Sequence, residues 1–232
     1  AGVPRGQGPA RRSRPRPHHT VSFRPFLHLD KGLFGRPTSP VRADVANVAG
    51  DYTYLTRGYY ASLDAELEGV LSIPSTTDAL DAYVVAIAME KAKQAGIPVP
   101  EYEIVTDRFP EPPMMAYPIN PFSLSGELLL DAQALESRRK GLTYTGKYAV
   151  LAQRLPHDHR VDVVRLVLGR TATAEYKGFG ERLFEVFRLP LMRVRVIVTL
   201  KAYQLSAIEP LPFKDLDEGE RAVLEGLGTW RA

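Results

Sequence analysis

One stretch of this sequence, Asp51–Tyr102, combines dense aromatic content, helical periodicity and sharp turn signals, and it constrains the fold more than any other part. Tyr52–Leu55 predicts a short strand, and tyrosines and leucines three and four residues apart predict a helix over Gly58–Glu68. Val70–Ile73 predicts a buried strand, and a Ser-Thr-Thr-Asp run supplies N-cap candidates for a helix over about Ala79–Ala95. This order of strands and helices favours an α/β layer.

The rest of the chain adds strands and helices to that layer. Met192–Leu200 has the clearest alternation of apolar residues, and Tyr203–Ile208 is its expected antiparallel neighbour. Asp107–Pro121 predicts a loop, because its five prolines disfavour regular structure. Further expected strands are Glu103–Thr106, Leu128–Leu130, Lys147–Arg154, Val161–Leu168 and its hairpin partner Thr171–Tyr176, and the expected helices are Asp131–Lys140, Gly180–Phe187 and Glu218–Leu227.

The expected fold class is therefore α/β, with a mixed sheet and packing helices, preceded by an extended basic arm rich in Arg and Pro. We expect residues 1–50 to form the arm and a strap, with one turn of helix in Asp44–Ala49, and residues 51–232 to form the globular body. A chain of 232 residues with 44% hydrophobic content can bury a sizeable core. The sequence lacks cysteine, which excludes disulfides, thiolate zinc sites and cysteine nucleophiles and favours a cytoplasmic location. It also lacks an apolar run of the roughly 20 residues that span a bilayer, so we expect no membrane partner.

Charge divides the chain unevenly. Residues 1–49 contain nine Lys/Arg and two Asp, whereas the remainder contains 21 Lys/Arg and 25 Asp/Glu, so the arm is basic and the body acidic. Arginine pairs with phosphate and stacks on bases, and the prolines keep the arm extended. One hypothesis is an RNA-binding arm, and the alternative is a solvated tail. The residues predicted to bind RNA are Arg5, Arg11, Arg12, Arg14, Arg16, His18, His19 and Arg24.

Four other patterns each allow a functional and a structural interpretation. His157–Asp158–His159 fits part of a metal site or an exposed turn. Ser123–Gly126 fits a phosphate-binding loop or a plain turn. The tyrosines Tyr52, Tyr54, Tyr59 and Tyr60 fit base stacking or core packing, and Arg193 and Arg195 fit RNA contact or exposure to water. We find no Ser/His/Asp arrangement, Walker loop or convincing carboxylate pair, and we expect neither a metal nor a cofactor.

Three segments resemble a known family. Tyr52–Pro74 contains a GYY-S-L-AE-G-IP pattern, Arg165–Met192 an LF-F-PL segment, and Leu205–Trp230 a closing I-P pattern. Together they resemble the RimK-like ATP-grasp amino-terminal domain. This resemblance implies association with an ATP-dependent carboxylate–amine ligase.

The middle of the chain is similar in order and spacing to the nucleotide-proximal part of ATP-grasp ligases. The segments that carry this similarity are Ala95–Glu101, Tyr117–Gly126 and Gln153–Val167. The resemblance implies a degenerate nucleotide site formed by Asn120, Ser123, Ser125 and Gly126, with Asn120 in place of a phosphate-binding lysine. The metal-binding half of such ligases has no counterpart in this sequence, and Ile208–Glu209–Pro210, the nearest segment, is too short to replace it. An amide cannot offset phosphate charge, so we do not expect ligase activity from this chain alone.

Two functions follow. The first is a non-catalytic RNA-associated protein, a ribosomal or ribosome-associated subunit whose partners are rRNA and the neighbouring proteins of a large ribonucleoprotein assembly. The alternative is an accessory or substrate-recognition domain of a RimK-like ATP-grasp carboxylate–amine ligase, with that ligase as its partner.

Overall fold

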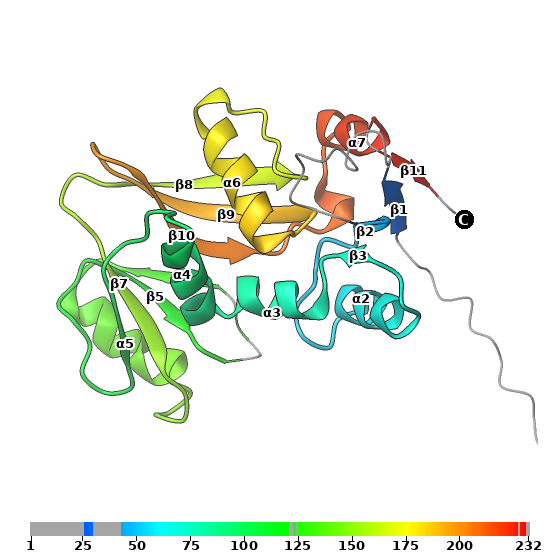
Figure 1. Ribbon diagram of the computed structural model, residues 1–232. Helices are drawn as coiled ribbons and strands as arrows, with labels where there is room; N and C mark the ends of the chain where they lie inside the picture. The colour runs from blue at the N-terminus through cyan, green and yellow to red at the C-terminus, as the bar shows by residue number, and fades with distance from the viewer. Residues whose placement is uncertain (1–25, 30–42, 121–122, 124, 227, 231–232) are drawn as a thin grey trace, which may run out of the picture.

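The computed structural model describes residues 26–29, 43–120, 123, 125–226 and 228–230, which form three sheets and their packing helices (Figure 1). The strands are β1 (Phe26–Leu29), β2 (Val45–Asn47), β3 (Ser72–Ile73), β4 (Tyr102–Val105), β5 (Met114–Pro118), β6 (Glu127–Leu129), β7 (Val150–Arg154), β8 (Arg160–Val167), β9 (Leu191–Val198), β10 (Tyr203–Glu209) and β11 (Gly228–Trp230). The helices are α2 (Arg57–Leu67), α3 (Thr76–Tyr83), α4 (Val85–Gln94), α5 (Ala132–Leu142), α6 (Lys177–Phe187) and α7 (Glu218–Glu225), with short 3₁₀ helices at Ala174–Tyr176 and Phe213–Asp215. The α/β fold class is confirmed. No helix among the described residues is long and apolar enough to cross a bilayer.

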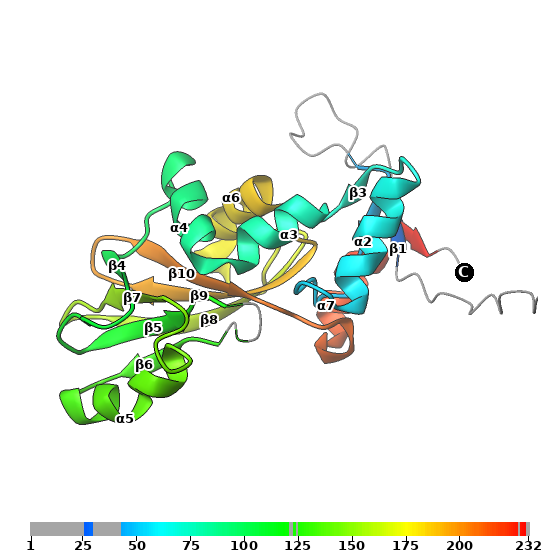
Figure 2. The ribbon, with the colours of Figure 1, turned by 90° about the horizontal axis from the view of Figure 1, so that it is seen from below.

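The β8–β9–β10 sheet lies at the centre of the molecule. Its strands are antiparallel, and the predicted pairing of Met192–Leu200 with Tyr203–Ile208 is confirmed by β9 and β10. Figure 2 shows helices α3, α4 and α6 on one side of this sheet and the β4–β7–β5–β6 sheet on the other. Side chains of β5 and β7 share one apolar core with those of β9 and β10, so the two sheets form a continuous packed unit.

Strand β5 corrects the prediction of a loop over Asp107–Pro121. Met114 and Ala116 are buried in the core under α5, and Met115 and Tyr117 are buried in the core shared with the central sheet. The prolines cluster before the strand and at its end, where they cost no ladder hydrogen bonds. Because both faces of β5 are buried, its sequence lacks the polar alternation that reveals a half-exposed strand.

Strand β2 was predicted as a turn of helix, but it pairs in parallel with β3 and antiparallel with β1. Its buried Asn47 explains the difference, because its amide nitrogen donates to Gly58 O at 2.7 Å and to Ser62 Oγ at 2.9 Å. These bonds fix α2 against the strand. The predicted strand at Tyr52–Leu55 is instead a turn in which Leu55 has a φ of 69°.

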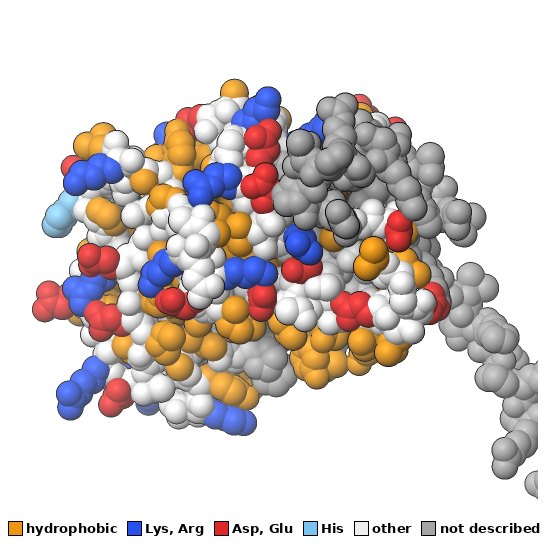
Figure 3. All heavy atoms as spheres, viewed as in Figure 1, with side chains coloured by type: hydrophobic (Ala, Val, Ile, Leu, Met, Phe, Trp, Pro, Cys, Tyr) orange, Lys and Arg blue, Asp and Glu red, His pale blue; other side chains and the backbone are white. Residues whose placement is uncertain are grey.

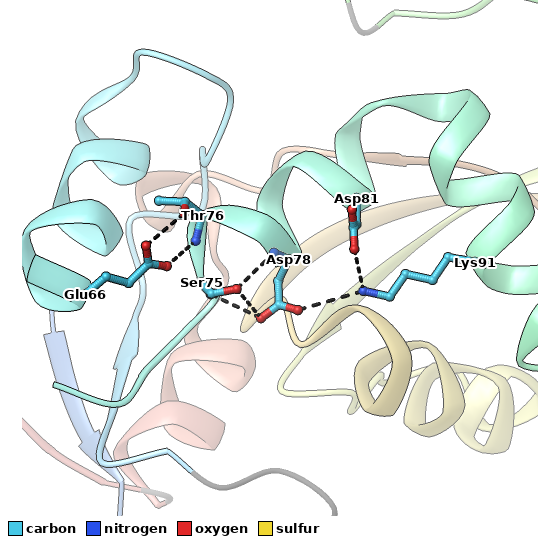
Figure 4. Close-up of polar contacts among 6 residues, drawn as sticks. All are labelled: Glu66, Ser75, Thr76, Asp78, Asp81 and Lys91. Carbon is cyan, nitrogen blue, oxygen red and sulfur yellow. Dashed lines mark hydrogen bonds and ion pairs between the residues drawn. The ribbon is translucent and has the colours of Figure 1, made fainter. Parts of the chain in front are cut away.

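The expected helix over Ala79–Ala95 is divided at Val84, which has the extended backbone angles φ −82° and ψ 96°. Polar contacts hold the two helices in place (Figure 4). Ser75 and Asp78 form a capping box at the start of α3, and Glu66 of α2 accepts from the Thr76 N–H at 2.5 Å. Lys91 of α4 pairs with Asp81 at 2.9 Å and with Asp78 at 3.9 Å, so ion pairs connect the two helices across the break.

The predicted hairpin partner of Val161–Leu168 was also wrong. Strand β8 pairs with β9, whereas Ala174–Tyr176 forms a 3₁₀ helix that leads directly into α6. Apolar residues of α6, including the fully buried Leu183 and Phe187, pack in the main core. Residues 174–187 are therefore helical because their apolar side chains cover one face of the central sheet.

Candidate functional site

The four residues of the predicted degenerate nucleotide site lie in the turn between β5 and β6. Asn120 Oδ1 accepts a hydrogen bond from the Ser123 N–H at 2.9 Å, and the two residues form an antiparallel bridge. Ser125 is exposed. Gly126 lies against the buried ring of Tyr117, since a Cβ at this glycine would be 2.6 Å from Tyr117 Cζ. The turn therefore closes on itself and on Tyr117.

A buried polar network joins the two sheets beneath this turn. Ser206 Oγ on β10 donates to Gln153 Oε1 on β7 at 2.6 Å, and Gln153 Nε2 donates to Ser206 O at 2.8 Å. Tyr117 OH lies 2.7 Å from Ser206 Oγ and is the donor of that pair, because the serine proton is already directed at Gln153. Each group is satisfied within the protein, so the network fills the space between the sheets and stabilises their packing.

Burial raises the pKa of Tyr117 well above its usual value. The Tyr117 phenol ionises near pH 10 in the unfolded chain and at a much higher pH in the folded chain. Below pH 10 it is protonated in both states, so its ionisation does not change the free energy of folding. Above that pH the unfolded state loses its proton first, and each such group removes about 1.4 kcal/mol of folding free energy per pH unit. We therefore expect urea unfolding between pH 9 and about pH 11.5 to show a falling stability. Tyr117→Phe should make this decline shallower, and an unchanged slope would contradict the assignment.

Glu209, at the end of β10, is held by two arginines of β9. Arg193 Nε lies 3.0 Å from Glu209 Oε2, and Arg195 Nη2 lies 2.8 Å from Glu209 Oε1. The residue Glu209 is only 6% exposed, so its carboxylate faces the two guanidinium groups and little water. Arg193 and Arg195, predicted either to contact RNA or to face water, thus both pair with the buried Glu209, while Arg193 itself is exposed and Arg195 is half-buried.

This cluster does not fit a bound magnesium ion. Magnesium requires several oxygen ligands in octahedral geometry, and two cations already engage the one carboxylate at this position. Among the described residues, no group of three His, Cys, Asp or Glu side chains is placed to hold a metal. The arrangement of Arg193, Arg195 and Glu209 is instead that of a structural ion cluster.

A cavity of about 260 Å³ opens beside Asn120. Three segments that are distant in the sequence form its walls: the turn before α2, the junction of α3 with α4, and the end of β5. The residues that line it are Thr53, Tyr54, Ala79, Leu80, Tyr83, Val84, Val85, Pro118, Ile119 and Asn120. Asn120 therefore belongs both to the predicted degenerate site and to an apolar cavity that the sequence did not predict.

Of the other predicted residues that the structure describes, Tyr54 lines this cavity, whereas Tyr52 and the His157–Asp158–His159 run do not. His157 and Asp158 are exposed in the turn between β7 and β8, and His159 Nδ1 lies 2.6 Å from Pro156 O. Tyr52 is buried in the core and donates to Asn47 O at 2.7 Å, so it supports the fold. The arginines and histidines predicted to bind RNA lie within residues 1–25, outside the described residues.

Comparisons with known proteins identify the family and the fold of this chain, as follows. The family model for the RimK-like ATP-grasp N-terminal domain matches residues 35–226. The search of solved structures found a RimK domain ATP-grasp protein from Sphaerobacter thermophilus DSM 20745 with a TM-score of 0.52 and 17% identity, covering 72% of this chain and 73% of that one. A D-alanine–D-alanine ligase from Helicobacter pylori gives a TM-score of 0.51 and 13% identity, covering 71% and 66% respectively. The ATP-grasp ligase PsnB, complexed with precursor peptide PsnA2 and AMPPNP, gives a TM-score of 0.50 and 15% identity, covering 73% of this chain and 66% of PsnB.

The chain thus spans slightly less than two thirds of the lengths of the D-alanine–D-alanine ligase and of PsnB. Among curated proteins, no significant match was found. The matched structures show an ATP-grasp-like fold and nothing more specific, because their identities are low.

These findings correct the first functional hypothesis. A ribosomal or RNA-binding function is wrong, since the family match and the solved structures named above point to ATP-grasp proteins. The hypothesis rested on the composition of residues 1–25, which lie outside the described residues. The resemblance noted in the sequence is confirmed over most of the body. On the match to residues 35–226, this chain belongs to the RimK-like ATP-grasp N-terminal domain family.

Proposed function

We propose that this chain is a substrate-recognition domain of a RimK-like ATP-grasp carboxylate–amine ligase and works in the cytoplasm with the catalytic module of that ligase. Family membership supports the association with a ligase. One observation carries the recognition role: an apolar cavity opens beside Asn120, where the resemblance places a phosphate-binding lysine. Asn120, Ser123, Ser125 and Gly126 are, on this proposal, the remnant of a nucleotide site that now borders a binding cavity.

The charges of the site support a role in substrate recognition for this chain and leave the ATP chemistry to the catalytic module. Phosphoryl transfer depends on cations that stabilise the transferred phosphate, and Glu209 pairs with two arginines in an arrangement that does not suit magnesium. PsnB, which has a similar fold, has a solved structure in complex with a precursor peptide, and this supports a peptide as the substrate class. Binding of ATP and its chemistry are accordingly assigned to the catalytic module.

Magnesium ATP is expected to leave the melting temperature of the isolated chain unchanged. A ligand present at 100 times its dissociation constant stabilises a protein by about 2.7 kcal/mol. For a chain of this size that would raise the melting temperature by about 5–10 °C. Differential scanning fluorimetry with millimolar magnesium ATP measures this directly, with a nucleotide-binding ATP-grasp ligase as the positive control. A rise of several degrees would show that the chain holds nucleotide by itself.

The association with a ligase is tested by crosslinking the chain in cells of its host and identifying the crosslinked peptides by mass spectrometry. We expect crosslinks to an ATP-grasp catalytic module, and we expect ADP formation by that module to depend on the chain. If the crosslinked module consumes ATP and forms product equally well without this chain, the proposed function is wrong.

A further inference from the structure

The cavity beside Asn120 has the size and chemistry of a pocket for one side chain. Its volume of about 260 Å³ is below the roughly 300–1,000 Å³ of pockets that hold drug-sized ligands or cofactors. Among the described residues that line it, none is Asp, Glu, Lys, Arg or His. Thr53 and Asn120 are uncharged polar residues, and the other lining residues are apolar or tyrosine. The cavity therefore suits an uncharged apolar group that is attached to a larger molecule.

A row of tyrosines extends from this cavity over α2. Tyr54, on the cavity wall, contacts Tyr59 edge to face with ring centres 5.3 Å apart, and Tyr59 contacts Tyr60 in the same way at 6.2 Å. Tyr54 and Tyr60 are 49% and 47% exposed. Figure 3 shows apolar side chains gathered along the lower edge of this face, below α3 and α2. Exposed aromatic rings with few charges are typical of the central part of a protein or peptide interface.

We infer that the cavity binds a large uncharged apolar side chain of a peptide substrate, and that the row Tyr54–Tyr59–Tyr60 supports the chain of that peptide beside it. This inference rests on the proposed function and names its substrate class. A charged side chain is disfavoured, because the described part of the lining offers no opposite charge to offset its loss of water. An aromatic or branched aliphatic side chain gains from burial against Ala79, Val84 and Ile119.

The inference is tested by methyl NMR of the full chain without any ligase. The ligands to add are N-acetyl-L-leucinamide and N-acetyl-L-phenylalaninamide, with N-acetyl-L-lysinamide and N-acetylglycinamide as matched controls. We expect the two apolar amides to shift the methyl signals of Ala79, Val84, Val85 and Ile119. Burying one such side chain strengthens binding by about tenfold to a hundredfold relative to the glycine amide. The lysine amide should bind no better than the glycine amide.

A pair of tyrosine variants separates the cavity from general surface effects. Tyr54→Ala removes a wall of the cavity and should weaken binding of the phenylalanine amide about tenfold. Tyr144→Ala is the control, because Tyr144 is similarly exposed and also contacts one tyrosine edge to face, at 5.9 Å, but lies outside the cavity. It should leave binding unchanged, and the amide spectrum of each variant reports whether the fold is intact.

Three results would overturn the inference. The apolar amides could cause no methyl shifts at their solubility limit, the lysine amide could cause shifts of equal size, or the two variants could weaken binding of the phenylalanine amide equally. Failure of the proposed function would look different. Since no ligase is present in the NMR experiment, a cavity that binds the apolar amides in a chain that does not affect any ligase would refute only the association. A chain that stimulates its ligase without shifts at the cavity would refute only this inference.

Discussion

Replacing Gly50 by alanine is expected to lower the free energy of unfolding by more than about 4 kcal/mol, a large part of the roughly 5–15 kcal/mol by which folded proteins are stable. Gly50 has a φ of +78°, where an L side chain is strained. An added Cβ would lie 2.8 Å from Leu211 C and 2.9 Å from Pro212 Cα, and closer still to Leu211 O. These are backbone atoms, held by the hydrogen bond from Leu211 N to Gly50 O at 2.9 Å, so the clash can be relieved only by separating the two segments. Urea unfolding followed by circular dichroism measures the loss.

Gly146→Ala is the matched control for this change. Gly146 has nearly the same backbone conformation, with a φ of +84°, but nothing lies within 4 Å of an added Cβ. It should therefore cost only the strain of a left-handed residue, about 1–2 kcal/mol. Equal losses for the two variants would mean that strain alone matters and that the contact between residues 50 and 211 is not tight.

Replacing Gln153 by alanine is expected to cost about 3–5 kcal/mol of unfolding free energy. The change leaves Ser206 O without its donor and Ser206 Oγ without its acceptor, and it opens a cavity between two sheets where no side-chain atom of Gln153 is exposed. An unsatisfied buried polar group costs about 1–3 kcal/mol, and the cavity adds to that cost. Chemical unfolding of the variant, paired with Ser206→Ala in a double-mutant cycle, gives the coupling energy.

Gln204→Ala supplies the comparison, because Gln204 lies on the same strand as Ser206. Among the described residues, its side-chain oxygen is buried and has no hydrogen-bond partner. Removing a group that already lacks a partner should cost clearly less than removing Gln153. If Gln153→Ala were no more harmful than Gln204→Ala, the network between the sheets would not stabilise their packing.

The sequence predicted the elements that have a periodic apolar pattern or a helix-capping motif. Strand β9 alternates, because one of its faces carries Arg193 and Arg195 while the other is buried, and α3 begins at a Ser75–Asp78 capping box. Strand β5 has neither signal, since it is buried on both faces and flanked by prolines. The break at Val84 follows from packing and from the contacts of Lys91 across the junction, which no local pattern reveals.

The candidate site was predicted only in part. The resemblance pointed to Asn120 and to the turn that follows it, and Asn120 does line the cavity. The other walls come from residues near 53 and near 80, which approach β5 only in the folded chain. Gln153 and Ser206 gave a usable signal, since each is a polar residue at an inward position of an apolar strand. The functional hypothesis rested on the basic arm because clustered arginines are easily recognised in a sequence. The cavity is lined mostly by apolar residues, which give no such signal.

We propose that this chain recognises the substrate of an ATP-grasp ligase through the cavity beside Asn120. The most direct measurement is steady-state kinetics of the ligase module that crosslinks to the chain, assayed with its peptide substrate and with either the unaltered chain or the Tyr54→Ala variant. We expect the variant to raise KM about tenfold and to leave kcat unchanged, because the cavity contributes binding and not chemistry. An unchanged KM, with Tyr144→Ala giving the same value, would contradict the claim.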